Sequence, residues 1–307
     1  ADGEGGNTAI GYNAGQQIST GQYNTALGAH ALDAATSADG STALGYGALG
    51  AQTTVSGDGS YNTAVGAFAG DAVTTGKQNV FVGTSAGGAT VDVDSAVIIG
   101  YGAGAANMTS DADGTIAIGL SAGAAIDSGI GNIAIGAIAL DAETDGDYST
   151  AVGYAALTAQ TGGGDGTVGN TAVGAAAGYS ITSGLRNTAI GAFSLEDATT
   201  GDGTTAVGFG ALMNQTTNGS TDNVYNTAVG AMSGDALTTG VQNVFIGANA
   251  GGATVDADNT VIVGYGAGAA NMTADADGTV AIGAYAGAAI TSGQYNVAIG
   301  PYAMDAN

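Results

Sequence analysis

The sequence has no cysteine and no tryptophan, one proline, and only two basic residues, Lys77 and Arg186, among its 307 residues. Without cysteine the chain forms no disulfide and offers no thiolate for catalysis or for a metal. Two basic side chains cannot neutralise the several phosphates that nucleic-acid binding requires, nor form a polybasic patch for an anionic membrane. No apolar run reaches the roughly 20 residues of a membrane-spanning helix. We therefore expect neither a nucleic-acid partner nor membrane insertion.

Acidic residues and glycine are abundant by contrast. The 26 acidic residues give a formal net charge of −24, and the 58 glycines exceed the share found in an average protein. Hydrophobic residues nevertheless make up 45% of the chain, so it is not a highly charged disordered polymer. The acidic, lysine-poor composition fits a secreted or saline setting.

A 17-residue repeat runs through the whole chain, as in Asn-Thr-Ala-Ile-Gly at 7–11 and Asn-Thr-Ala-Leu-Gly at 24–28. We call the last glycine of this motif the anchor glycine. Seventeen copies are present, at Gly11, Gly28, Gly45, Gly66, Gly83, Gly100, Gly119, Gly136, Gly153, Gly174, Gly191, Gly208, Gly230, Gly247, Gly264, Gly283 and Gly300. Such self-similarity predicts one continuous repeat array over residues 1–307.

Two longer periods are superimposed on this unit. Every third gap between anchors is longer than the others, which groups the repeats into triplets. The segment 62–142 also matches 226–306 almost line by line, so a nine-repeat block at 7–169 is followed by an incomplete second block at 170–307. The residue after the anchor is aromatic at the end of each triplet: Tyr46, Tyr101, Tyr154, Phe209 and Tyr265.

Each position around the anchor glycine has a restricted chemistry. The three residues before it are mostly β-branched or small, which predicts a short strand buried on both faces. The anchor itself suits a tight bend or a close backbone approach. Three residues after the anchor stands Ala in fifteen copies and Ser in two, which predicts tight packing between layers. Asn stands four before the anchor in ten copies, which predicts a ladder of side-chain hydrogen bonds.

A 17-residue unit cannot bury its own apolar strand, but stacked units can. We therefore predict an all-β fold, a repetitive parallel β-solenoid with about one coil per 17-residue repeat. At ~4.8 Å per coil the stack would be roughly 80 Å long. One triplet per turn, giving a wider three-sided prism, is an alternative that the sequence leaves open.

The motif Asn-Thr-Ala-Val-Gly-x-x-Ala-Leu/Gly, with Thr-Gly before the next Asn, resembles the repeats of phage tail-fibre and related bacterial surface proteins. It is also similar to the head repeats of trimeric autotransporter adhesins, whose core is like Val280-Ala281-Ile282-Gly283. The resemblance covers nearly the whole chain, and the 17-residue length is closer to the fibre repeats. It implies a left-handed β-roll, assembled as a homotrimer in an extracellular, cell-surface or virion fibre that projects a binding tip or itself adheres.

These observations predict a structural fibre, filament or adhesin subunit rather than an enzyme. Its activity would be self-assembly and surface attachment, with itself and a cell-surface glycan or receptor as partners. The single histidine, His30, is expected to face solvent without a catalytic role. The alternative is a flat face that binds glycan or ice through a threonine column at Thr8, Thr25, Thr42 and Thr63. We expect that column to be buried, and Val80, Val97, Ile116 and Ile133 interrupt it.

Neither end of the array carries a recognisable cap, which predicts head-to-tail stacking of solenoid ends. The stretch from Gly300 to the Gly11 of a following copy would be close to one repeat in length. A fragment cut from a longer fibre is the alternative. The predicted assembly residues are Asn7, Thr8, Ala9, Ile10, Val297, Ala298, Ile299, Pro301, Tyr302 and Met304.

Alternating aspartates in the turns suggest calcium as the one candidate cofactor. The pairs recur between the two blocks, at Asp92, Asp94, Asp111 and Asp113 and again at Asp256, Asp258, Asp275 and Asp277. We favour the simpler interpretation that Asp and Gly form turns and keep the chain in solution. The longer linkers at 51–61, 106–114, 158–170, 213–226 and 270–278 are expected to protrude, either for receptor contact or lateral packing or as insertions without a role.

Overall fold

A computed structural model describes residues 5–53, 59–162, 166–216 and 223–305. Within them the fold is all-β, with seventeen strands of three residues and two short 3₁₀ helices, η1 (Ser110–Ala112) and η2 (Ala274–Ala276). The chain forms two compact units. The first unit comprises residues 1–149 and 161–166, and the second unit comprises 150–160 and 167–307. None of the helices in the described ranges is long and apolar enough to cross a membrane.

Each repeat contributes one strand. The first unit contains β1 (Thr8–Ile10), β2 (Thr25–Leu27), β3 (Thr42–Leu44), β4 (Thr63–Val65), β5 (Val80–Val82), β6 (Val97–Ile99), β7 (Ile116–Ile118) and β8 (Ile133–Ile135). The second unit contains β9 (Thr150–Val152), β10 (Thr171–Val173), β11 (Thr188–Ile190), β12 (Thr205–Val207), β13 (Thr227–Val229), β14 (Val244–Ile246), β15 (Val261–Val263), β16 (Val280–Ile282) and β17 (Val297–Ile299).

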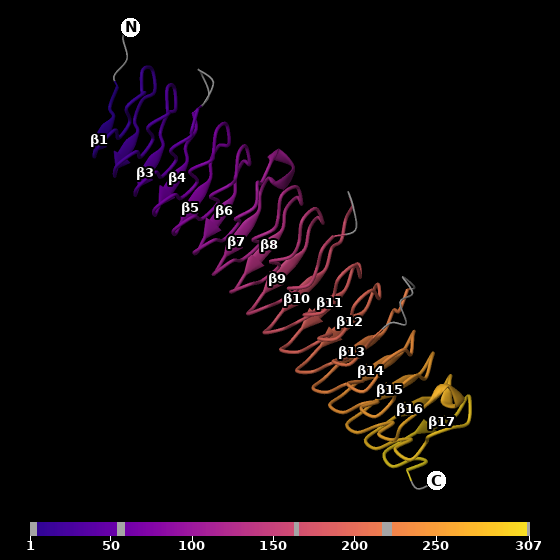
Figure 1. Cartoon of the computed structure of the whole chain (residues 1–307). Helices are drawn as coiled ribbons and strands as arrows, with labels where there is room; N and C mark the ends of the chain where they lie inside the picture. Colours follow the sequence, from indigo (N-terminus) through magenta and orange to yellow (C-terminus); the bar gives the residue numbers. More distant parts are fainter. Residues whose placement is uncertain (1–4, 54–58, 163–165, 217–222, 306–307) are drawn as a thin grey trace. The chain divides into compact units, whose positions relative to one another are not determined.

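Within each unit, successive strands pair in parallel and in register (Figure 1). Thr8 lies opposite Thr25, for example, and Thr171 opposite Thr188. Because strands of consecutive repeats are direct neighbours, one repeat makes one coil. The predicted parallel β-solenoid is therefore confirmed, and the alternative of one triplet per turn is wrong. The handedness of the coil stays a prediction.

Only the middle residue of each strand is buried, except in β1, where all three residues are exposed. The prediction that the strands are buried on both faces is wrong for the described chain. A coil this small has a single interior, so side chains that alternate along a strand point inward once and outward twice. Inward residues are Ala in most coils, and Phe81 and Phe245 fill the space where the turn opposite has only glycine.

Buried amide side chains join the coils inside the turns, as the sequence predicts. The Nδ2 of Asn79 donates to the carbonyl oxygen of Val93 at 2.7 Å, and its Oδ1 accepts from the backbone N–H of Ala96 at 2.8 Å. Asn243 repeats this pattern in the second unit. Each Asn thus satisfies two backbone groups of the next coil that no strand pairing would satisfy.

The anchor glycines lie at the closest approach between coils. Gly66 has φ +140°, and a Cβ built on it would lie 2.5 Å from the carbonyl oxygen of Gly83. Gly264 is equivalent, with a Cβ 2.5 Å from the oxygen of Gly283. Both the backbone conformation and the space require glycine, as the sequence predicts.

In the longer coils, side chains of the linker are buried inside the solenoid. In the first unit, the Nε2 of Gln52 donates to the Oγ of Ser41 at 3.0 Å, and the Nδ2 of Asn62 donates to the Oε1 of Gln52. Met108 and Met272, in two other lengthened coils, are also buried. These linkers begin inside the solenoid. The segments at 54–58, 163–165 and 217–222, on which the predicted protrusions partly fall, lie outside the described residues.

Candidate functional site

The first and third residues of each strand point outward, and together they form what we call the outer face. The third residue is Ile, Leu or Val in every coil. Several of these side chains are well exposed: Leu27 at 41% and Leu44 at 42% in the first unit, and Ile190 at 40% and Ile246 at 41% in the second. No charged residue occupies either column of the outer face. Each unit therefore presents an uncharged surface on which the third residue of every strand is aliphatic.

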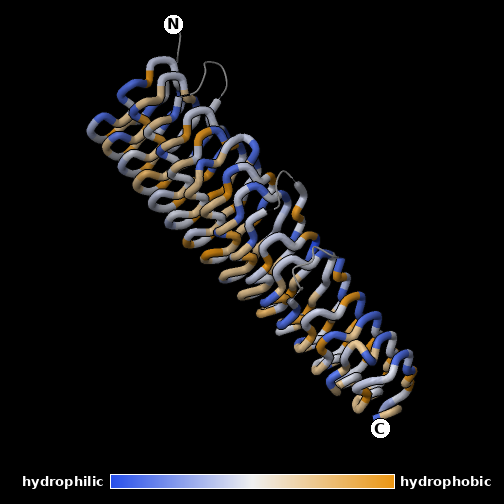
Figure 2. Tube along the Cα trace, turned by 45° about the vertical axis from the view of Figure 1, so that its right-hand side comes forward, coloured by the Kyte–Doolittle hydropathy of each residue, from blue (hydrophilic) through white to orange (hydrophobic). Residues whose placement is uncertain are grey.

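The first residue of each strand adds a second column to the outer face. Thr8, Thr25 and Thr42 are exposed, and Thr63 is half-buried. The prediction that this threonine column is buried is wrong, because only the middle residue of a strand faces the interior. Val and Ile replace Thr in β5–β8 and in β14–β17, whereas β9–β13 carry Thr. Figure 2 shows how hydrophobic and hydrophilic segments recur from coil to coil within each unit.

The negative charge lies on the turns. Six residues before the anchor, an aspartate recurs whose Oδ1 accepts a backbone N–H from the preceding coil. In the first unit, Asp39 accepts from Gln22 at 2.7 Å and Asp147 accepts from Ile130 at 2.9 Å. In the second unit, Asp202 accepts from Leu185 at 2.8 Å. These aspartates stabilise the stack by satisfying donors that would otherwise lack a partner.

Four of the predicted calcium ligands belong to this column. The Oδ1 of Asp94 accepts from Lys77, and the Oδ1 of Asp113 accepts from Asp94. In the second unit, Asp258 accepts from Val241 and Asp277 from Asp258. The recurrence of aspartate here has a structural cause that requires no metal.

The remaining predicted ligands, two residues earlier in each turn, add negative charge beside this column. Burial raises the pKa of the Asp113 carboxyl, and the negative charges of Asp94, Asp92 and Asp111 raise it further, against the lowering effect of the backbone N–H of Asp94. The Oδ1 of Asp92 is buried and has no hydrogen-bond partner within the described part of the chain. A cation beside these carboxylates would relieve both their repulsion and the unpartnered oxygen.

In the second unit the equivalent carboxylates are engaged differently. Asp256 accepts from the backbone N–H of Ala274, and its neighbour Asp275 lies in η2. Among the residues that the structure describes, no group of three ligand-type side chains is arranged to hold a metal ion. Calcium binding stays a prediction.

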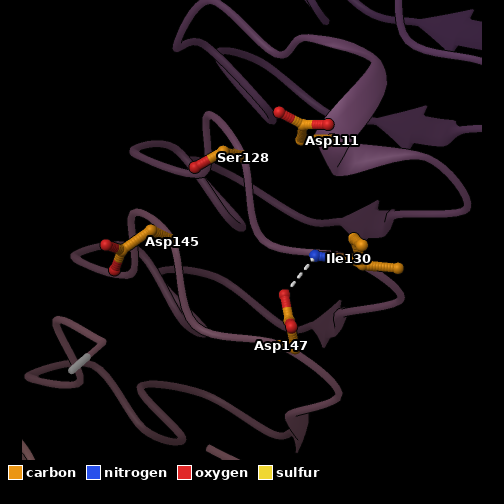
Figure 3. A pocket seen from close by; sticks show the side chains of 5 residues that line it. All are labelled: Asp111, Ser128, Ile130, Asp145 and Asp147. Carbon is orange, nitrogen blue, oxygen red and sulfur yellow. Dashed lines mark hydrogen bonds between the residues drawn. The ribbon is translucent and has the colours of Figure 1, made fainter. Parts of the chain in front are cut away.

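A hollow of about 340 Å³ lies on the turns of the first unit (Figure 3). Asp111, Ser128 and Asp145 line one side of it, and Ile130 and Asp147 line the other. One carboxylate oxygen of Asp147 already accepts a hydrogen bond from the backbone N–H of Ile130. The hollow therefore has acidic walls, but part of its acceptor capacity serves the backbone.

Three aspartates that stand five positions after the anchor are also perturbed. Burial raises the pKa of the carboxyl groups of Asp71, Asp141 and Asp235, although hydrogen bonds from nearby backbone N–H groups oppose the shift. Burial is the larger effect in each case. The folded chain therefore holds these carboxylates at some cost at neutral pH.

The predicted assembly residues fall into two groups, one in each unit. In the first unit, Thr8, Ala9 and Ile10 are all exposed, and Asn7 donates to Gly21 and accepts from Asn24. In the second unit, the sequence-predicted residues Val297, Ile299, Pro301, Tyr302 and Met304 are exposed, whereas Ala298 is buried. Stacking through these residues stays a prediction.

Sequence reasoning missed the outer face as a surface, although its signal was visible. A column that is always Ile, Leu or Val was interpreted as core. No protein-family model and no curated protein sequence matches the chain. The likeness to fibre and adhesin repeats therefore stays a prediction, and the function rests on the geometry.

Proposed function

We propose that the chain is a structural subunit of an extracellular fibre or adhesin, on a cell surface or a virion, whose activity is self-assembly and attachment rather than catalysis. Its first partner is a second copy of this chain, which packs against the outer face. The observation that supports this proposal is the contrast between a net charge of −24 and an outer face without a single charge. The negatively charged turns keep the protein in solution, while the uncharged outer face is available for a second copy to cover.

The size of the outer face suits a stable interface. Soluble monomers rarely expose a continuous apolar patch of more than a few hundred Å². A standard specific interface buries about 800 Å² per partner, and the outer face of the first unit extends over eight strands. Repulsion between acidic turns opposes close approach on any other side.

The test is the mass of the particle in solution. Light scattering after gel filtration is expected to show an oligomer of the full chain at micromolar concentration. Leu44→Glu combined with Ile246→Glu places a charge on the outer face of each unit and should shift the mass to the monomer. Tyr61→Glu, at an exposed turn position, is the matched control and should leave the mass unchanged. A wild-type chain that is monomeric under these conditions would refute assembly through the outer face.

One observation favours a second function, binding of a regular solid such as ice. Thr8, Thr25 and Thr42 are exposed and in register, and five consecutive strands of the second unit start with Thr. A rigid array of hydroxyl and methyl groups at coil spacing could order water along the outer face. The two functions use the same surface, so a monomeric chain that inhibits ice recrystallisation would favour the second over the first.

A further inference from the structure

Aromatic rings that are exposed or partly exposed form a continuous strip beside the outer face of the first unit. The strip consists of Tyr12, His30, Tyr46 and Phe68, which come from four successive coils, one or two positions after the anchor glycine. Ring centroids lie 5.5, 5.8 and 5.1 Å apart along the strip, and neighbouring rings meet edge to face at 76° to 81°. Tyr12 is 72% exposed and Tyr46 is 50% exposed.

The local sequence builds this strip. An aromatic residue follows the anchor of the third coil, and Gly47 then replaces a side chain that would obstruct the next ring. A Cβ on Gly47 would lie 3.2 Å from the ring of Phe68. The arrangement fixes each ring against its neighbour, so the strip is rigid, and holding an apolar ligand on it requires little further ordering.

Polar groups border the strip. The Oδ2 of Asp33 lies 2.9 Å from the Nδ1 of His30, and both side chains are about one-third exposed. The phenol hydroxyls of Tyr12 and Tyr46 add donors and acceptors at the ends of exposed rings. The strip thus combines flat apolar surfaces with hydrogen-bonding groups at their edges.

The same combination recurs in the second unit. Tyr265 and Tyr285 meet edge to face at 5.4 Å, and Tyr285 stacks on Tyr302 at 5.5 Å. Tyr285, Tyr302 and Asp305 line a hollow of about 420 Å³. Here too a glycine, Gly266, precedes the ring of the following coil.

We propose that these aromatic strips bind a neutral polysaccharide, whose pyranose rings stack on the exposed tyrosines while carboxylates and phenols accept hydrogen bonds from its hydroxyl groups. The C–H face of a pyranose is weakly positive and packs on the negative face of an aromatic ring. Adjacent rings alternate in orientation, so ring faces and ring edges alternate along the strip, which suits a polymer of repeating rings. The net charge of −24 repels sulfated, carboxylated and phosphate-bearing polymers. This binding surface goes beyond the proposed assembly and does not depend on it.

Affinity electrophoresis of the full chain tests the proposal. Native gels contain galactomannan, hydroxyethylcellulose or arabinogalactan as neutral polymers, or alginate as an anionic one. At least one neutral polymer is expected to retard the wild-type chain, and alginate is not. Tyr46→Ala combined with Phe68→Ala should weaken the binding attributable to the first unit, and adding Tyr285→Ala and Tyr302→Ala should weaken total binding by about tenfold or more.

The control removes two tyrosines of similar exposure from a different column. Tyr23 and Tyr61 are 61% and 59% exposed and stand five positions before the anchor, so Tyr23→Ala with Tyr61→Ala should leave retardation unchanged. The proposal is overturned if none of the three neutral polymers retards the wild type, or if the control pair lowers binding as much as the strip variants. Light scattering on the same samples distinguishes glycan binding by the strip from assembly through it. If the strip variants lose the oligomer, the strip belongs to the assembly interface and the glycan proposal fails.

Discussion

Replacing one anchor glycine by alanine should open the solenoid locally. Gly66 is the example, because it lies inside the first unit with coils on either side. Its φ of +140° is a conformation that an L side chain rarely adopts. A Cβ there would lie 2.5 Å from the carbonyl oxygen and 2.6 Å from the carbonyl carbon of Gly83. Both contacts are with backbone, so no side chain can rotate away to make room.

The expected loss of stability follows from two costs. Forcing a non-glycine residue into this backbone region costs about 1–3 kcal/mol. Relieving the contact requires the coils to separate, which stretches the 2.8 Å hydrogen bond from Gly83 N–H to the carbonyl oxygen of Val65. Leaving a buried backbone group unpaired costs about 1–3 kcal/mol more. We therefore expect Gly66→Ala to lower the free energy of unfolding by about 2–6 kcal/mol.

The control is Gly102→Ala in the same unit. Gly102 also has a positive φ, +62°, but the nearest atom to a Cβ there is the Ser121 hydroxyl at 3.8 Å. This variant should cost only about 1 kcal/mol, from the left-handed conformation alone. Urea titration followed by far-UV circular dichroism compares the variants, and hydrogen exchange should show faster exchange over the segment 63–83 in Gly66→Ala. Equal stability of the two variants would refute the close coil contact.

Three further predictions follow from the polar groups. Because burial raises the pKa of Asp71 and Asp235, ionising these carboxyl groups costs more in the folded than in the unfolded chain, so stability should rise as pH falls from 7 through the raised pKa values toward 3.8. Melting curves between pH 7 and pH 4 check this. Asp71→Asn should raise the melting temperature at pH 7 and make the melting temperature less dependent on pH. Asn79→Ala should cost about 2–5 kcal/mol in urea unfolding, because it leaves Val93 and Ala96 without a partner, and an effect below about 1 kcal/mol would contradict the Asn ladder. If calcium binds the aspartates around Asp113, millimolar calcium should raise the melting temperature more than magnesium at equal ionic strength, and chelator should reverse it; equal effects of both ions would indicate screening alone.

The repeat made most of the fold predictable. The anchor glycine, the small residue (Ala or Ser) three positions after it and the recurring Asn each correspond to one contact between adjacent coils. Each contact recurs in many coils, so the residues at one position of the repeat report many copies of the same contact. The parallel register and the role of Gly66 followed from this periodicity.

The orientation of the strand residues could not be predicted in the same way. A three-residue strand is too short for an alternation of polar and apolar residues to show which side is inside. Ile, Leu or Val in the column of Leu44 is equally compatible with a core and with a surface that another molecule covers. The aromatic column at Tyr46 was visible as a periodic feature, but only the structure shows that Phe68 and His30 extend it into a strip.

Two of the lengthened coils at the ends of triplets have a structural role as well. In the third coil of the first triplet, Ser41 replaces the Asn of the ladder; its Oγ accepts the backbone N–H of Asn62 at 3.4 Å, but it carries no amide group. Gln52, supplied by a lengthened coil, bonds to Ser41 and to Asn62 and so replaces the missing amide. Gln215 does the same beside Thr204 in a lengthened coil of the second unit. In these two coils, a ladder residue without an amide is accompanied by a lengthened linker that supplies one, whereas the lengthened linkers with Met108 and Met272 bury an apolar side chain instead.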